Sequence, residues 1–214
     1  MIGVIRVFTT ENEEILEQHS KLISNRYGVP TVTKCIPEQP LGIFNDETEE
    51  IAIPKIVEVG KALEREGSKV LVISCAADPA INELRKEVSI PVIGAGSAAA
   101  LNALAIGEPV GVLGITDNPP IVIKELIGNL LVGYVRPKGV SNTTDLLTPS
   151  GQEKGLQAAK ELLNQGAKVL VFACTGFSTI GLADVLRKEL NVPIIDAVEA
   201  EGLFASQLYQ NQTI

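Results

Sequence analysis

The sequence contains few of the residue types that commonly carry chemistry. It has one histidine, three cysteines far apart and no tryptophan, and it lacks any run of lysine or arginine. With a net charge of -8, the missing basic run argues against a nucleic-acid or anionic-membrane partner. Small molecules and other protein chains are therefore the expected partners.

Long apolar stretches are absent as well. None approaches the roughly 20 residues that spanning a bilayer requires, and the N-terminal stretch is interrupted at Arg6, which argues against a signal peptide. An odd number of cysteines cannot form a fully paired disulfide framework. We therefore expect a cytoplasmic protein with reduced thiols. Since no metal-ligand cluster or phosphate-binding glycine loop is visible, we expect neither a metal nor a cofactor.

Short runs rich in valine and isoleucine alternate with longer stretches of helical spacing. Such runs are typical of strands buried on both faces of a parallel sheet, so the alternation predicts an α/β fold. The expected strands are 2–8, 69–74, 91–95, 109–115, 168–173 and 192–196, and the expected helices are 11–27, 49–66, 82–88, 97–106, 121–129, 152–164, 182–190 and 198–209. A polar loop at 137–151 lies where it could cover a site.

An internal repeat divides the chain. The run VLVISC, ending at Cys75, returns 99 residues later as VLVFAC, ending at Cys174, and weaker matches extend in both directions. A repeat of about half the chain predicts two pseudo-symmetric lobes, each a parallel-sheet αβα sandwich, with a cleft between them. The predicted division places residues 1–95 and 198–214 in lobe 1 and residues 96–197 in lobe 2.

Both repeated cysteines are expected at the carboxyl end of a strand, where α/β proteins usually bind ligands. A helix is predicted to start next to each, at Asp78 and Pro79 in the first half and near Ser178 or Thr179 in the second. The backbone N–H groups of a helix start lower the pKa of a neighbouring thiol, whereas apolar burial raises it.

Two equivalent thiols that face one cleft suit a particular reaction. Inverting a stereocentre next to a carbonyl needs a base on one face and an acid on the other, and a thiolate and a thiol can exchange these roles. A single cysteine at the end of an apolar strand is usually a small buried hydrophobic residue. Its recurrence in the repeat favours Cys75 and Cys174 as a catalytic pair. Cys35 has no counterpart and no assigned role, and His19 is expected on a solvent-facing helix surface.

The cysteine segments SCAADPAI and ACTGFSTIG, followed by SIPVIGAGSAAA and NVPIIDAVEAE, resemble those of the aspartate/glutamate/hydantoin racemase superfamily. The resemblance covers nearly the whole chain and is strongest to the hydantoin racemase branch. It implies two α/β lobes, cofactor-independent racemisation by Cys75 and Cys174, and a homo-oligomer. The implied substrate is a 5-substituted hydantoin or a related cyclic ureide.

The same resemblance implies where substrate binds. Many hydantoin racemases have Asn-Pro-Asn-Thr after the first strand, where this chain has FTTEN, so Thr9 or Thr10 would replace the usual amide. The implied substrate-binding residues are Thr10, Ala76, Ala77, Thr116, Thr175 and Gly176, and Arg6 and Arg136 are alternative donors. Two alternatives remain open: an aspartate/glutamate racemase, and a small-molecule binding protein without turnover, which the matched thiols argue against.

Overall fold

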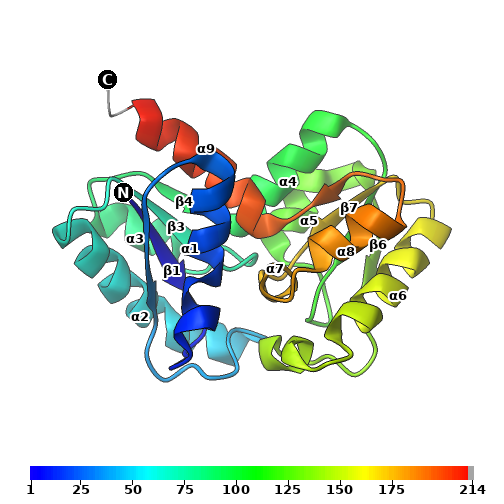
Figure 1. The fold of residues 1–214 in the computed structure, drawn as a ribbon, viewed down its shortest axis with the longest axis horizontal. Helices are drawn as coiled ribbons and strands as arrows, with labels where there is room; N and C mark the ends of the chain where they lie inside the picture. Colours follow the sequence, from blue (N-terminus) through cyan, green and yellow to red (C-terminus); the bar gives the residue numbers. More distant parts are fainter. Residues whose placement is uncertain (212–214) are drawn as a thin grey trace.

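A computed structural model of the protein describes residues 1–211 (Figure 1). Residues 212–214, which the predicted division places in lobe 1, lie outside the described part. The first half contains β1 (Ile2–Arg6), α1 (Glu13–Tyr27), β2 (Thr31–Cys35), α2 (Asp46–Arg65), β3 (Val70–Ser74), α3 (Ile81–Glu87) and β4 (Val92–Gly94). The second half contains α4 (Ala95–Ile106), β5 (Val110–Leu113), α5 (Ile121–Ile127), η1 (Gly128–Leu130), β6 (Leu131–Val135), η2 (Thr143–Leu147), α6 (Gly151–Asn164), β7 (Val169–Phe172), α7 (Gly176–Thr179), α8 (Leu182–Glu189), β8 (Ile194–Ile195) and α9 (Ala197–Asn211).

The two halves repeat one topology. The strands form two four-stranded parallel sheets, in the orders β2-β1-β3-β4 and β6-β5-β7-β8. These orders become identical when the second half is renumbered from one. The α/β fold with two lobes is therefore confirmed, and the repeat in the sequence corresponds to a repeat in structure.

Alternation along the strands builds a sandwich in lobe 1. Ile2 and Val4 of β1 join a core with residues of α1 and α9, whereas Ile5 points to the opposite face, where it packs with α2 and α3. In lobe 2 one continuous core joins the sheet to α4, α5, α6 and α8. Successive strand residues point to opposite faces, so helices must cover both sides of each sheet.

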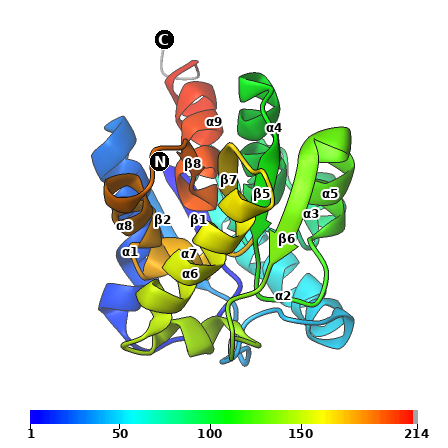
Figure 2. The same cartoon turned by 90° about the vertical axis from the view of Figure 1, so that its right-hand side faces the viewer.

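The last helix of each half crosses to the other lobe. Helix α4 follows β4 of the first sheet but packs on α5 of the second half, and α9 follows β8 of the second sheet but packs on α1 and β3. Helices α4 and α9 also contact each other, and both views show them at the same end of the molecule (Figures 1 and 2). The lobes are thus interlocked. The predicted boundaries at 95/96 and 197/198 stay a prediction.

Strands β2 and β6 were not predicted from the sequence. Both are edge strands whose residues are mostly half-buried or exposed, so they lack the continuous apolar pattern of the inner strands. The predicted helices are present with ends shifted by up to three residues, and a separate short helix, α7, precedes α8. Among the described residues, no helix has the length and apolar content needed to cross a membrane.

Candidate active site

A cavity of about 640 Å³ lies where the two lobes meet, and both repeated cysteines line it. Cys75 is half-buried just beyond β3, and Cys174 is buried just beyond β7. Of the predicted binding residues, five line the same cavity: Ala76, Ala77, Thr116, Thr175 and Gly176. Thr10 is not part of the wall.

The two cysteines have matching backbone surroundings. The N–H of Gly176, two residues beyond Cys174, lies 3.3 Å from its sulfur. At Cys75 the corresponding group, the N–H of Ala77, also contacts the sulfur. A backbone N–H directed at a sulfur stabilises the thiolate more than the thiol. Each cysteine therefore has one backbone N–H, two residues further along the chain, that stabilises its thiolate form.

Burial nevertheless dominates the ionisation of both thiols. It raises the pKa of Cys174 to about 11, although Gly176 N–H, Thr143, Phe177 N–H and Arg6 act in the opposite direction. Burial also raises the pKa of Cys75 far above its ordinary value. The nearby Cys174 thiol and the carboxylates of Glu49 and Asp78 raise this pKa further. Of the two opposing effects expected at each thiol, desolvation therefore outweighs the helix N-terminus, and both pKa values are raised. Cys174 is the more readily ionised of the two.

The threonine hydroxyls predicted to bind substrate already have partners within the protein. Thr175 Oγ1 donates to the carbonyl of Ser74 at 3.0 Å, which ties the two cysteine segments together directly. Thr116 Oγ1 donates to the carbonyl of Asn118 at 2.7 Å. Thr10 Oγ1 accepts from the N–H of Asn12. The first two shape the cavity wall, and Thr10 instead supports the start of α1.

Asp78 does not start the helix that follows it. Its backbone has a positive φ of 53°, and α3 begins only at Ile81. The side chain reaches the N-terminus of the crossing helix α4, where it accepts from the N–H of Gly96 at 2.6 Å and of Ser97 at 2.9 Å. A side chain at Gly94 would overlap this carboxylate. The loop after Cys75 is therefore anchored to α4.

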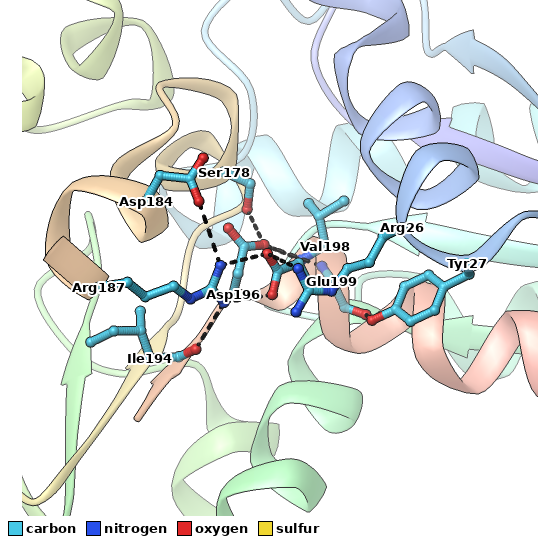
Figure 3. Close-up of polar contacts among 9 residues, drawn as sticks. All are labelled: Arg26, Tyr27, Ser178, Asp184, Arg187, Ile194, Asp196, Val198 and Glu199. Carbon is cyan, nitrogen blue, oxygen red and sulfur yellow. Dashed lines mark hydrogen bonds and ion pairs between the residues drawn. The ribbon is translucent and has the colours of Figure 1, made fainter. Parts of the chain in front are cut away.

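Asp196 provides the corresponding anchor in lobe 2 (Figure 3). Its buried carboxylate accepts from the N–H of Val198 at 2.8 Å and of Glu199 at 3.2 Å, at the start of α9, and from Ser178 Oγ at 2.6 Å. Ser178 belongs to α7, directly after Cys174. Each cysteine loop is thus joined by a buried aspartate to the helix that crosses to the other lobe.

Burial of Asp196 predicts a measurable pH dependence of stability. Desolvation raises its pKa from 3.8 to about 6, so the native state binds this proton more tightly than the unfolded chain does. Stability from this group is therefore lost as pH rises from about 4 to about 6. Asp196→Asn retains a capping side chain and removes the titration. Urea unfolding from pH 4.5 to 7.5 should show the variant gaining roughly 2 kcal/mol relative to wild type.

Asp184→Asn is the matched control, because Asp184 is an exposed carboxylate on the neighbouring helix α8 (Figure 3). Its stability should run parallel to that of wild type over the same pH range. A parallel curve for Asp196→Asn as well would contradict the assignment of the buried carboxylate.

Two residues have a different place from the one expected. His19 was predicted to face solvent, but it is only 1% exposed, because α1 packs against both β3 and α7. Of the two alternative cations, Arg6 lines the cavity and is 3% exposed, whereas Arg136 pairs with Asp117 at 2.8 Å and is not part of the wall. The helix pattern of α1 gave no sign of the second lobe that covers His19.

The remaining wall was largely missed by sequence reasoning. Thr143 comes from the predicted loop 137–151 and contacts Cys174, so that loop does reach the site. Carboxylates, two asparagines, a serine and apolar side chains line the rest of the wall. They are Asp46, Glu47, Glu49 and Asp117; Asn45 and Asn118; Ser74; and Val7, Phe8, Ile43, Phe44, Ile115, Pro119, Pro120, Ile121 and Ala173. Only the loop composition offered a signal for any of these positions.

Comparison with known proteins defines the class. The chain is similar to the hydantoin racemase of Pseudomonas sp. (strain NS671), with 29% identity over 181 residues that cover 79% of this chain and 70% of that protein. The fold is similar to allantoin racemase from Klebsiella pneumoniae, with a TM-score of 0.84, 23% identity, and 99% and 88% of the two chains covered. Glutamate racemase RacE1 from Bacillus anthracis matches with a TM-score of 0.73 and 19% identity, over 99% and 82% of the chains. The class is that of isomerases of the racemase type.

The sequence profile described as Asp/Glu/Hydantoin racemase matches residues 2–201. The chain belongs to this family, and the resemblance seen in the cysteine segments is confirmed.

Proposed function

We propose that the protein racemises a 5-substituted hydantoin or a related cyclic ureide, with Cys75 and Cys174 as the two acid-base groups and without a cofactor. The observation that carries the proposal is that two cysteines from equivalent positions of the two lobes line one cavity. A binding protein without turnover would have no need for two matched thiols.

In the proposed reaction one cysteine removes a proton from the substrate carbon and the other cysteine delivers one. The thiolate of the first cysteine takes the proton, so a C–H bond breaks and an S–H bond forms. The electron pair passes to the adjacent carbonyl as an enolate, and the thiol of the other cysteine then protonates the opposite face. Buried Arg6 supplies a positive charge at the cavity wall, which favours the enolate.

Ionisation of a thiol is the costly step. With the pKa of Cys174 at about 11, forming its thiolate at pH 8 costs on the order of 4 kcal/mol. Burial raises both thiol pKa values, but the cost is higher at Cys75 because the carboxylates of Glu49 and Asp78 raise its pKa as well, whereas Arg6 lowers that of Cys174. We therefore expect the rate to rise with pH above neutrality, and we assign Cys174 as the base that ionises first.

The charge of the wall favours a neutral or weakly acidic substrate. Four carboxylates line the cavity, whereas Arg6 is the one cation among the described wall residues. The side-chain carboxylate of aspartate or glutamate would be repelled by the carboxylates near the start of α2, which are Asp46, Glu47 and Glu49. The apolar wall residues suit a hydrophobic substituent on the ring. These features support the hydantoin class over aspartate or glutamate.

A solvent-exchange assay tests the function. Single enantiomers of several 5-substituted hydantoins, aspartate and glutamate are incubated with the protein in deuterated water, with protein-free samples to correct for spontaneous racemisation. We expect loss of optical rotation with uptake of one deuterium for at least one hydantoin and none for the amino acids. Turnover of the amino acids alone would establish the alternative racemase, and no exchange with any compound would overturn the proposal.

Three further expectations remain predictions from the sequence and the resemblance. They are a homo-oligomeric state, a cytoplasmic location and the absence of a nucleic-acid or membrane partner.

A further inference from the structure

His19 lies at the contact between the two cysteine segments. Its Nδ1 is 2.8 Å from Ser74 Oγ, and its Nε2 is 2.8 Å from Thr179 Oγ1. Ser74 directly precedes Cys75 at the end of β3, and Thr179 ends α7, the short helix that follows Cys174. The imidazole ring thus contacts a side chain on each cysteine segment, in addition to the direct bond from Thr175 Oγ1 to the Ser74 carbonyl.

This bridge belongs to a longer buried chain of hydrogen bonds. Ser74 Oγ donates to Glu201 Oε1 of α9 at 2.6 Å, and Arg6 donates from its Nη2 to Thr179 Oγ1 at 3.3 Å. Every side chain in it is at most 6% exposed. Five elements of the fold, β1, α7, α1, β3 and α9, are thereby joined at the cavity, whose wall includes Arg6 and Ser74. Glu201 Oε2 has no hydrogen-bond partner among the described residues, but the paired members of this buried network hold one another in one arrangement.

Neutral imidazole fits both neighbours. When Ser74 donates to Glu201, its oxygen accepts from His19 Nδ1–H. Nε2 then accepts from Thr179 Oγ1, a hydroxyl that can alternatively donate to the Thr175 carbonyl at 3.4 Å. In this arrangement one ring nitrogen donates and the other accepts, as in the uncharged ring. Burial lowers the pKa of His19 well below its ordinary value, and the positive charge of Arg6 lowers it further, so the ring is neutral at physiological pH.

We propose that His19 is a positioning residue that fixes the spacing between the Cys75 and Cys174 segments, so that the two thiols reach opposite faces of one substrate carbon. The proposal rests on the proposed two-thiol racemisation. His19 is not part of the cavity wall, so it acts through Ser74 and Thr179 rather than on the substrate.

The spacing has a kinetic signature. Proton removal needs one thiol in place, whereas inversion needs both, and a displacement of about 1 Å can cost roughly 100-fold in rate. If the bridge is lost, the thiolate of one cysteine can still take the proton, the resulting thiol can exchange it for deuterium from solvent, and that deuterium can return to the same face of the carbon. Exchange of the substrate hydrogen with solvent then continues while racemisation slows, so the ratio of exchange to racemisation rises.

The test compares variants by this ratio, measured with single enantiomers of the hydantoin turned over by wild type in deuterated water. Deuterium uptake reports exchange, and optical rotation reports racemisation. His19→Gln can keep one of the two contacts but cannot bridge both. Tyr27→Phe is the matched control, because Tyr27 lies on the same helix and its hydroxyl donates to the Glu199 carbonyl at 2.7 Å (Figure 3), and neither residue lines the cavity.

We expect His19→Gln to lower kcat for racemisation about 100-fold with little change in KM, and to raise the exchange-to-racemisation ratio at least about tenfold. Tyr27→Phe should keep the wild-type ratio even where its unfolding midpoint falls. A purely structural role for His19 would lower stability and leave the ratio unchanged, which would overturn the proposal.

A second pair of variants decides the matter if His19→Gln does not fold. Thr179→Val removes the hydroxyl that His19 contacts at nearly constant volume, and Thr179→Ser retains it. The ratio should rise in Thr179→Val and return to the wild-type value in Thr179→Ser. Equal ratios in both would contradict positioning through His19. The proposed function fails separately, if a variant lacking either cysteine racemises at the wild-type rate.

Discussion

Cys75→Ser and Cys174→Ser should each abolish racemisation. Each thiol serves one face of the substrate carbon in the proposed mechanism, and the serine hydroxyl is far too weak an acid to replace a thiolate. We expect a fall in kcat of at least about 1000-fold for either variant, measured by polarimetry with purified protein. The two side chains differ by one atom, so the fold should be retained.

Exchange separates the roles of the two cysteines. Each variant keeps one thiol and should exchange the hydrogen of one enantiomer with solvent, and the two variants should prefer opposite enantiomers. Cys35→Ser is the control, because Cys35 lies at the end of edge strand β2 and does not line the cavity. Racemisation at the wild-type rate in either catalytic variant, or the same preferred enantiomer in both, would exclude the paired-thiol mechanism.

Gly96→Ala should destabilise the protein strongly although alanine is the better helix former. A methyl group at Gly96 would overlap the carbonyl oxygen of Ala76, with the Ala76 carbonyl carbon at 2.8 Å and Asp78 Oδ1 at 3.1 Å. These are backbone atoms and an anchored carboxylate, so relief requires the loop after Cys75 to move. We expect a loss of about 3 kcal/mol or more in the free energy of unfolding, together with loss of racemisation.

Gly155→Ala in α6 is the control for this effect. The three atoms nearest to its added methyl group would all belong to the Leu182 side chain, the closest at 2.6 Å, and a side chain can shift more readily than backbone. Denaturant unfolding should show a clearly smaller loss, and racemisation should remain. If Gly96→Ala were as stable as wild type, the prediction would be wrong, and the distance between α4 and the loop after Cys75 would be large enough for a methyl group.

The sequence alone determined the elements that are buried on both faces. The inner strands β1, β3, β5 and β7 carry continuous apolar runs, and the repeat of Cys75 at Cys174 identified both lobes and one cavity-lining residue in each. These features are local, since a strand covered by helices on both sides must be apolar along its whole length. The edge strands β2 and β6, with half-exposed residues, carry no such signal.

The tertiary structure decided everything that depends on the meeting of the two lobes. The periodicity of α1 placed His19 at the surface because a helix pattern records one packing partner, whereas α1 also contacts α7 of the other lobe. Asp78 and Asp196 could be recognised as anchors only once α4 and α9 were seen to cross between lobes. The thiol pKa values depend on the same contact, since desolvation from both lobes outweighs the local N–H groups that the sequence does predict.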